Sequence, residues 1–270
     1  MGTHVEQKET DITQMNKTLK DRAVIVTGAA SGIGKAIALE MARRGANVVV
    51  NYIGASDAAE EVVNAIRGAH GTAIAIEADV SKADDVSRMV SQTLSHLGRI
   101  DVLVNNAGIE KESPFLEKSE DDWDRVIAVN LKGPFLCTQA AGREMARRGN
   151  GTIINISSVH EDLPFPGYAA YCASKGGLRM LCRDLAVELA KYNINVVNVA
   201  PGAIDTPINK RTLSDPERKL ALEREIPLGR IGEPEEVAKL VCYLASDDAS
   251  YITGTTIVID GGLMHQTGSL

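Results

Sequence analysis

The stretch AVIVTGAASGIG, residues 23–34, places a short apolar run directly before a glycine-rich turn and the start of a helix. Ile33, Ile37 and Met41 recur at helical spacing, and a second apolar run follows at residues 46–52. The first run is rich in β-branched residues, as strands are. This order of strand, helix and strand predicts a βαβ unit, which joins two parallel strands of one sheet.

The same alternation continues along the rest of the chain. With the strand at 23–28 and the run at 46–52, further runs of strand type follow at 72–80, 100–108, 151–158, 194–202 and 254–262. These runs lack strict alternation of apolar and polar residues, which is typical of strands buried on both faces. The sequence therefore predicts an α/β protein with a doubly wound Rossmann fold, in which helices cover both faces of a seven-stranded parallel sheet.

Length and composition fit a single domain. The chain has 270 residues, and no linker rich in Pro, Gly or Ser separates two halves. We expect a flexible N-terminal tail at 1–19 and one domain over 20–270. Residues 203–233 break the pattern with charges and prolines, and they are expected to form either a small substrate lid or a passive surface excursion.

Charge and cysteine content narrow the class of partner. The formal net charge of −7 argues against nucleic acid or an anionic membrane as a partner, and no long apolar run suggests a membrane span. The four cysteines lack metal-ligand spacing, so we expect no metal site and reduced, mostly buried thiols in a cytoplasmic protein. The expected partner is a small molecule.

Gly28, Gly32 and Gly34 follow the first strand with the spacing G-x-x-x-G-x-G. The first permits a sharp turn, the second a close approach of the backbone to a pyrophosphate, and the third tight packing of the helix on the strand. A plain strand-to-helix turn is the alternative. The position of this glycine-rich turn, at the first junction between a strand and a helix, favours the binding of a dinucleotide.

The end of the second strand bears on which dinucleotide is used. Asn51 and Tyr52 stand where a carboxylate would favour NAD over NADP, and no nearby Arg or Lys favours NADP. We therefore expect NAD or NADP, with dual use. Asp79, at the end of the third strand, either meets the adenine edge or caps the next helix.

Tyr171 and Lys175 lie four residues apart in a predicted helix, so their side chains share one face. A nearby ammonium and a nicotinium ring both favour the phenolate, which would make Tyr171 a general base. Such a pair in isolation usually just packs. Ser158, at a strand end, could hold a substrate oxygen against the phenol, and Asn130 could interrupt its helix and hold a water for proton relay.

The motifs TGAASGIG, NNAG, VNLKG, YCASK, APG and DGG, with Ser158 thirteen residues before YCASK, together resemble the short-chain dehydrogenase/reductase family from about residue 20 onward. The resemblance implies a catalytic tetrad of Asn130, Ser158, Tyr171 and Lys175. The resemblance also places Asn106 and Gly108 along the cofactor, and it places Thr206 against the carboxamide of the nicotinamide. The cofactor contacts expected from the motifs and the resemblance are Gly28, Ser31, Gly32, Ile33, Gly34, Asn51, Tyr52, Asp79, Val80, Asn106, Ala107, Gly108, Tyr171, Lys175, Pro201, Gly202, Ile204 and Thr206.

NNAGIEKE, ISSVHE, PGAIDTPIN and GEPEEVA look like the bacterial glucose 1-dehydrogenases within this family. The likeness implies a sugar site formed by Glu110, His160 and Asn209 beside Ser158 and Tyr171, although His160 could also merely order its loop. It implies oxidation of β-D-glucose to the lactone. Two alternatives stand beside it: a reductase of 3-oxoacyl thioesters or other ketones, and a non-catalytic dinucleotide sensor. Family resemblance also implies a homotetramer built on the predicted helices near 120–148 and 168–191.

Overall fold

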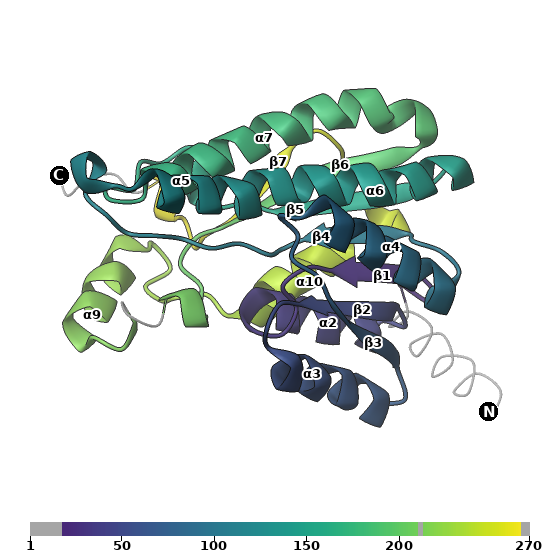
Figure 1. Ribbon diagram of the computed structural model, residues 1–270. Helices are drawn as coiled ribbons and strands as arrows, with labels where there is room; N and C mark the ends of the chain where they lie inside the picture. Colours follow the sequence, from purple (N-terminus) through teal and green to yellow (C-terminus); the bar gives the residue numbers. More distant parts are fainter. Residues whose placement is uncertain (1–17, 210–212, 266–270) are drawn as a thin grey trace, which may run out of the picture.

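The computed structural model describes residues 18–209 and 213–265, and its centre is one parallel sheet (Figure 1). The sheet confirms the predicted fold class, with seven strands in the order β3-β2-β1-β4-β5-β6-β7. The strands are β1 (Ala23–Val26), β2 (Asn47–Tyr52), β3 (Thr72–Glu77), β4 (Val102–Asn105), β5 (Gly151–Ile156), β6 (Ile194–Pro201) and β7 (Thr256–Ile259).

Chain order reverses direction across the sheet between β1 and β4. β1 pairs with β2 on one side and with β4 on the other, with Ile25 opposite Val49 and Leu103. Loops leaving the carboxyl ends of these two strands run to opposite faces, which opens a crevice between them. This switch point is where a ligand of an open α/β sheet binds.

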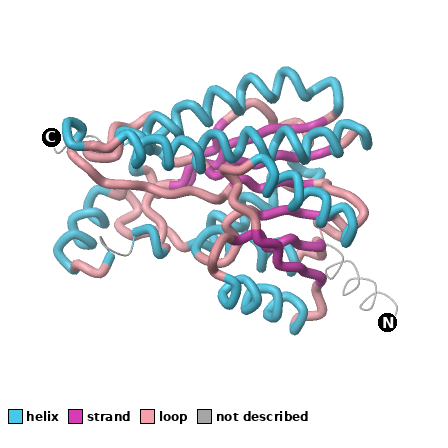
Figure 2. Tube along the Cα trace, in the orientation of Figure 1, coloured by secondary structure: helices cyan, strands magenta, loops and turns pink. Residues whose placement is uncertain are grey.

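Two layers of helices cover the sheet, and the loops gather at one end of it (Figure 2). One layer packs α2, α3 and α10, and the other packs α4, α6 and α7. The helices are α2 (Gly32–Arg43), α3 (Ser56–Gly68), α4 (Ala83–Leu97), α5 (Glu120–Ile127), α6 (Gly133–Arg148), α7 (Ala169–Leu189), α9 (Pro216–Glu225) and α10 (Pro234–Leu244).

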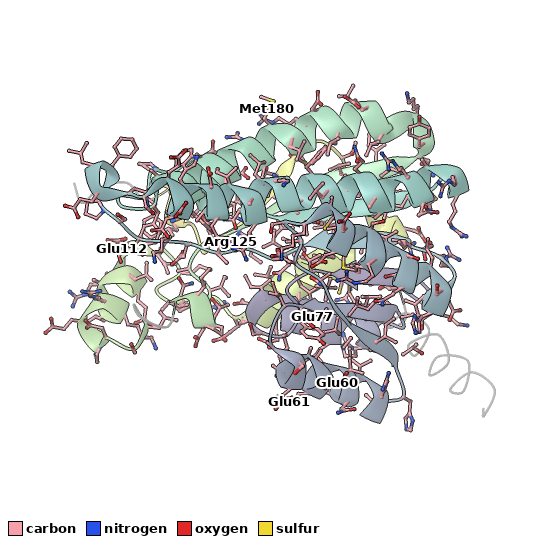
Figure 3. All side chains as sticks on the ribbon, viewed as in Figure 1. Glu60, Glu61, Glu77, Glu112, Arg125 and Met180 are labelled. Carbon is pink, nitrogen blue, oxygen red and sulfur yellow. The ribbon has the colours of Figure 1, made fainter. Side chains whose placement is uncertain are left out.

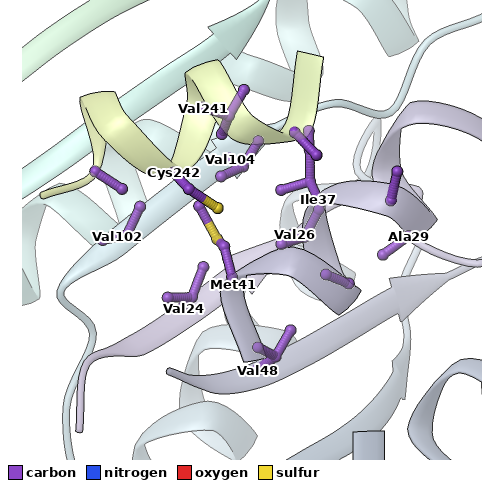
Figure 4. Close-up of a cluster of buried hydrophobic side chains, with 14 of the residues drawn as sticks. Val24, Val26, Ala29, Ile37, Met41, Val48, Val102, Val104, Val241 and Cys242 are labelled. Carbon is purple, nitrogen blue, oxygen red and sulfur yellow. The ribbon is translucent and has the colours of Figure 1, made fainter. Parts of the chain in front are cut away.

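Alternate residues of β1 supply both cores. Val24 and Val26 face the layer that contains Met41 of α2, whereas Ile25 faces the opposite layer. Figure 4 shows the first of these cores, where α2 and α10 meet over β1 around Met41 and Cys242. Each large side chain buried in this way contributes about 1.5–3 kcal/mol to folding, so these contacts anchor β1 between the two layers.

A row of buried asparagines crosses three strands just below the crevice. Asn105, Asn155 and Asn198 are register partners on β4, β5 and β6. The Asn105 amide donates to Asn155 Oδ1 at 2.9 Å, and the Asn155 amide donates to Asn198 Oδ1 at 2.9 Å. A slip of one residue would leave these buried amides unpaired, so the row fixes the register of the strand ends.

The start of the chain is tied to the core earlier than residue 20. Residues 1–17 of the expected tail lie outside the described residues, but Leu19 is fully buried. Its N–H donates to the Arg44 carbonyl at 3.1 Å. The ordered domain therefore includes at least Leu19.

The excursion expected at 203–233 leaves the sheet after β6 and returns to the same point. Its base is closed by two backbone hydrogen bonds, from Asp205 N to Gly232 O and from Gly232 N to Ala203 O. Helix α9 lies beyond the strand ends, apart from the two helical layers (Figure 1). The excursion also contains the short helix η5 (Pro207–Asn209).

Over the described ranges, none of the helices combines the length and the apolar character needed to cross a bilayer. All four cysteines are free, and three of them are buried. In the same ranges, no three His, Cys, Asp or Glu side chains are grouped in a way that could hold a metal ion.

Candidate active site

The turn after β1 requires glycine at all three of its motif positions. Gly28 and Gly32 adopt φ values of +63° and +53°, a region that side chains disfavour. A Cβ on Gly34 would lie 2.4 Å from both the Gly28 carbonyl and the Asn106 amide nitrogen. Any side chain there would push α2 away from the turn. No acidic residue occupies the first turn of α2, whose N-terminal N–H groups favour an anion.

A cavity of about 720 Å³ begins at this turn and runs along the carboxyl ends of the strands. It is large enough for a dinucleotide fragment together with a substrate. All the expected cofactor and substrate residues except Gly34 line it, and among the expected catalytic residues only Asn130 does not. Gly34 and Asn130 act from behind its wall, through packing and hydrogen bonds.

Asn51 braces the turn. Its side chain is buried, accepts from Gly28 N at 3.2 Å and donates to the carbonyl oxygens of Ile76 and Ala78. The oxygen and the nitrogen of the Asn51 side chain are therefore both engaged within the protein. The structure thus shows Asn51 supporting the turn rather than reaching toward a ribose. Tyr52, half-buried beside it, keeps an exposed edge on the cavity.

Asp79 is held by its own neighbours. Its carboxylate accepts from the Ser81 N–H at 3.0 Å and the Ser81 hydroxyl at 2.6 Å, and Arg125 lies 3.4 Å away. Burial raises the pKa of Asp79, but the Ser81 hydrogen bonds and the Arg125 charge outweigh it, so the pKa is lowered. Asp79 thus orders the turn before α4. Arg125, on α5 (Figure 3), lines the same end of the cavity and was missed by the sequence analysis.

Three of the four expected catalytic side chains meet where β5 ends. Ser158 caps the short helix η3 (Val159–Glu161), and its hydroxyl accepts from His160 N at 3.2 Å. Tyr171 and Lys175 come from the first turns of α7. The Lys175 Nζ lies 5.5 Å from the centre of the Tyr171 ring and donates to the Ile156 carbonyl at 2.8 Å.

Asn130 stands in a π-helical turn, Ala128–Lys132, that interrupts the run between α5 and α6. The structure therefore shows the local interruption expected there. The Asn130 amide oxygen accepts from Ile109 N at 2.9 Å, and its nitrogen donates to Ile109 O at 2.8 Å and to Ser174 at 3.2 Å. Through these hydrogen bonds, Asn130 connects the loop after β4 to α7, the helix that carries Lys175.

The protein's own groups shift the pKa of the phenol against expectation. Burial raises the pKa of Tyr171 to about 12, a hydrogen bond with Ser158 partly opposes it, and the Glu110 charge adds to it. Burial also lowers the pKa of Lys175 to about 8, and Glu161 opposes that shift. The adjacent ammonium therefore does not by itself make Tyr171 a base, because desolvation outweighs it.

Aromatic rings form the wall beside Tyr171. His160 stacks on Phe165 with ring centres 4.2 Å apart, and Phe165 stacks on Tyr168 at 4.0 Å. The Nδ1 of His160 lies 3.3 Å from the Leu163 carbonyl. Burial lowers the pKa of His160, which keeps its ring neutral near pH 7. His160 therefore orders its loop and also lines the cavity, while its role in a sugar site stays a prediction.

The other two expected substrate residues differ in what they can offer. Asn209 donates its amide to the Ile204 carbonyl at 2.8 Å. Glu110 lines the cavity, and burial, followed by the charge of Glu112, raises its pKa. Figure 3 places Glu112 in the loop that runs to α5.

Sequence reasoning missed most of the apolar wall at the substrate end. These residues are brought together from the loop after η3, from η5, from α9 and from the C-terminal turn. They are Leu163, Pro164, Phe165, Ile208, Leu222 and Leu263. All but Leu222 of α9 belong to loops or short 3₁₀ turns, where periodicity gives no signal.

Comparisons with known proteins agree with this geometry. The family model described as enoyl-(acyl carrier protein) reductase matches residues 28–264. A 3β-hydroxysteroid dehydrogenase 1 from Eggerthella lenta is 47% identical over 255 residues, which cover 94% of this chain and 98% of that protein. A 3-oxoacyl-(acyl-carrier-protein) reductase from Staphylococcus epidermidis is 44% identical over 243 residues, covering 90% and 99%.

Solved structures match as well. A gluconate 5-dehydrogenase from Burkholderia cenocepacia, in complex with NADP and tartrate, has a TM-score of 0.89 and 33% identity, over 94% of this chain and 100% of that one. A 7α-hydroxysteroid dehydrogenase complexed with NADH and 7-oxo glycochenodeoxycholic acid has a TM-score of 0.88 and 34% identity, over 92% and 96%. With this fold, this site and these relatives, the chain belongs to the short-chain dehydrogenase/reductase family.

Proposed function

We propose that this enzyme uses a nicotinamide dinucleotide to interconvert a secondary alcohol and a ketone on a largely apolar, ring-shaped skeleton of the hydroxysteroid class. The observation that carries the proposal is the apolar and aromatic wall beside Ser158 and Tyr171. The identity to a 3β-hydroxysteroid dehydrogenase supports it, as does the 7α-hydroxysteroid dehydrogenase of similar structure.

The residues present fit a dinucleotide. The left-handed turn at Gly28 and Gly32 lines the cavity, and the first residues of α2 line the same space. A Cβ on Gly108 would lie 3.6 Å from Asn130 Oδ1 and 3.9 Å from the Lys175 Nζ, so this part of the backbone lies beside both catalytic candidates. Thr206, nearly buried at the far end, lines the cavity where the carboxamide is expected.

When bound, the nicotinamide supplies the hydride acceptor or donor, and its oxidised ring carries a positive charge. Tyr171 takes the hydroxyl proton of the alcohol, and Ser158 holds the oxygen. Lys175 binds the ribose and passes the proton onward, while Asn130 fixes the loop and helix between which that path runs. A cation beside Tyr171 would lower the pKa that burial raises.

Glucose remains the second candidate because Glu110, His160 and Asn209 all line the cavity. Every hydroxyl of a buried sugar needs a hydrogen-bond partner, since an unpaired one costs about 1–3 kcal/mol. Asn209 already donates to Ile204, and the Nδ1 of His160 is engaged by Leu163. The apolar skeleton therefore suits this cavity better than a polyol.

For the cofactor, we propose that both NAD and NADP are accepted and that NAD is preferred. Arg125 is the cation among the residues that line the adenosine end, and it is paired with Asp79. A ribose 2′-phosphate would have to compete for this charge. The cavity residues around Tyr52 are uncharged, so they neither repel nor select the adenosine ribose of NAD or the phosphorylated ribose of NADP.

A substrate panel read by reduced-nicotinamide absorbance tests the proposal. The panel holds a 3β-hydroxysteroid, its 3α epimer, cyclohexanol, glucose and gluconate with each dinucleotide, and a 3-oxosteroid and a 3-oxoacyl thioester in reverse. We expect kcat/KM to be highest for a hydroxysteroid. Faster turnover of glucose or of the thioester would refute the apolar substrate and favour the corresponding alternative, while no turnover of anything would favour the sensor.

We also propose that the enzyme is a homotetramer. Phe135 on α6, with Met180 and Val187 on α7, are 44%, 62% and 79% exposed, and Figure 3 shows Met180 on the outer side of α7. Large apolar side chains on two neighbouring helices are typical of a contact surface. Light scattering that gives a monomer mass at micromolar concentration would contradict it.

A further inference from the structure

One acidic side chain beneath the site has no role in the proposed chemistry. Glu161 ends η3, and its side chain is 2% exposed. Its carboxylate accepts a hydrogen bond from the Ser157 hydroxyl at 2.5 Å, and its backbone N–H donates to the Ser158 carbonyl at 2.9 Å. A buried carboxylate is costly unless it is paired, so its position calls for a reason.

Glu161 also joins this strand end to α7. Its Oε1 lies 3.5 Å from the Nε of Arg179, one helical turn beyond Lys175. A Cβ on Gly176 would lie 3.8 Å from the Glu161 carbonyl oxygen, so η3 packs directly against the turn that carries Lys175. The carboxylate therefore touches the segments that carry both Ser158 and Lys175.

The charges around Glu161 are few. On α7 it faces Lys175, Arg179 and the buried Cys182, and just after η3 its neighbour Asp162 takes the outer side of the same Arg179. Strand β6, which also packs on η3, carries no titratable side chain. Arg179 is thus shared between an inner and an outer carboxylate, and Glu161 is the one that acts on Lys175.

We propose that Glu161 is a positioning residue that holds the Lys175 ammonium in its charged form and fixes the end of β5 that presents Ser158. Lys175 is 5% exposed and donates to a neutral carbonyl, so it needs a nearby negative charge to keep its proton. Glu161 provides this charge without contacting the substrate, because Ser157 and Arg179 hold it beneath the cavity. The inference concerns the same site as the proposed function, but it can be tested without turnover.

The test follows the titration of Lys175 by NMR in protein labelled with ¹³C at the lysine ε carbons, with the resonance assigned by its absence in Lys175→Met. In the wild type we expect a midpoint of about 8. In Glu161→Gln the midpoint should fall by about one pH unit, as expected for losing one partly screened charge that raises the pKa of Lys175. Glu161→Asp keeps the negative charge, so its Lys175 midpoint should lie close to that of the wild type. Asp162→Asn, which removes the outer partner of Arg179, is the matched control and should leave the midpoint in place.

An unchanged midpoint in folded Glu161→Gln would overturn the proposal, and so would an equal shift in Asp162→Asn. Circular dichroism checks that each variant is folded. If Glu161→Gln does not fold, Glu161→Met carries the test, because it removes the same charge from a side chain of similar length and the Lys175 midpoint should again fall. A midpoint that does not fall would count against the proposal. An inactive enzyme whose Lys175 titrates as expected would refute the proposed function alone.

Discussion

Replacing Lys175 by methionine should stabilise the folded protein while removing its activity. Burial lowers the pKa of the Lys175 ammonium from 10.5 to about 8, and one pH unit corresponds to about 1.4 kcal/mol. Keeping the proton near pH 7 therefore costs the folded state about 3 kcal/mol. Methionine fills a similar volume but leaves the Ile156 carbonyl without its donor, which costs about 1 kcal/mol. The net gain in unfolding free energy is about 2 kcal/mol.

The pH dependence of this gain has a definite sign. The unfolded chain binds the Lys175 proton more tightly than the folded protein does, so wild-type stability rises as the pH passes from about 8 toward 10.5. The advantage of the variant should therefore shrink to nearly zero by about pH 9.5. Burial raises the pKa of Cys137, Cys182 and Cys242 to about 12, which weakens both proteins alike in alkali. The difference between the two proteins is thus the quantity to compare.

Urea denaturation followed by the fluorescence of Trp123 measures both effects, at one fixed protein concentration so that any assembly contributes equally. Lys191→Met, at an exposed position just after α7, is the matched control and should change stability by less than about 0.5 kcal/mol. A Lys175→Met protein that is less stable than the wild type near pH 7, beside an unchanged control, would refute the reasoning.

Three further outcomes follow from the site. Tyr171→Phe should lower kcat by about 10²–10⁴-fold while leaving dinucleotide affinity in place, and undiminished turnover would remove Tyr171 as the base. Gly34→Ala puts a Cβ 2.4 Å from Gly28 O and the Asn106 amide, so it should lower the unfolding free energy by about 1–3 kcal/mol and weaken dinucleotide binding in a fluorescence titration. Phe165→Ala should raise KM for a hydroxysteroid about tenfold, by loss of about 1.4 kcal/mol of apolar contact, yet change KM for cyclohexanol little; equal effects on both would argue against an extended substrate wall.

The sheet could be predicted from the sequence because the signals for strands are local and periodic. Apolar runs mark all seven strands, but six of them were predicted too long at their carboxyl ends, by one to three residues. The run at 100–108, for example, forms a strand only over Val102–Asn105. Beyond that point Asn106, Ala107 and Gly108 are still small, but they leave the ladder and line the cavity. Composition cannot show where pairing stops.

The features of the site likewise fall into those that local spacing predicts and those that depend on contacts between distant segments. The glycine turn and the pair Tyr171 and Lys175 follow from spacing, which a single helix or turn fixes. The occupied amide of Asn51 and the paired carboxylate of Asp79 depend on contacts between distant strands and helices. So does the raised pKa of Tyr171, which comes from burial that no spacing reveals.

The most direct test is the ionisation of Tyr171 itself, followed by NMR of protein labelled with ¹³C at the tyrosine ζ carbons. Without dinucleotide we expect the phenol to ionise at about 12. With saturating oxidised dinucleotide it should ionise several pH units lower, because a positive ring then lies beside it. A phenol that still ionises near 12 in that complex would contradict the assignment of Tyr171 as the working base.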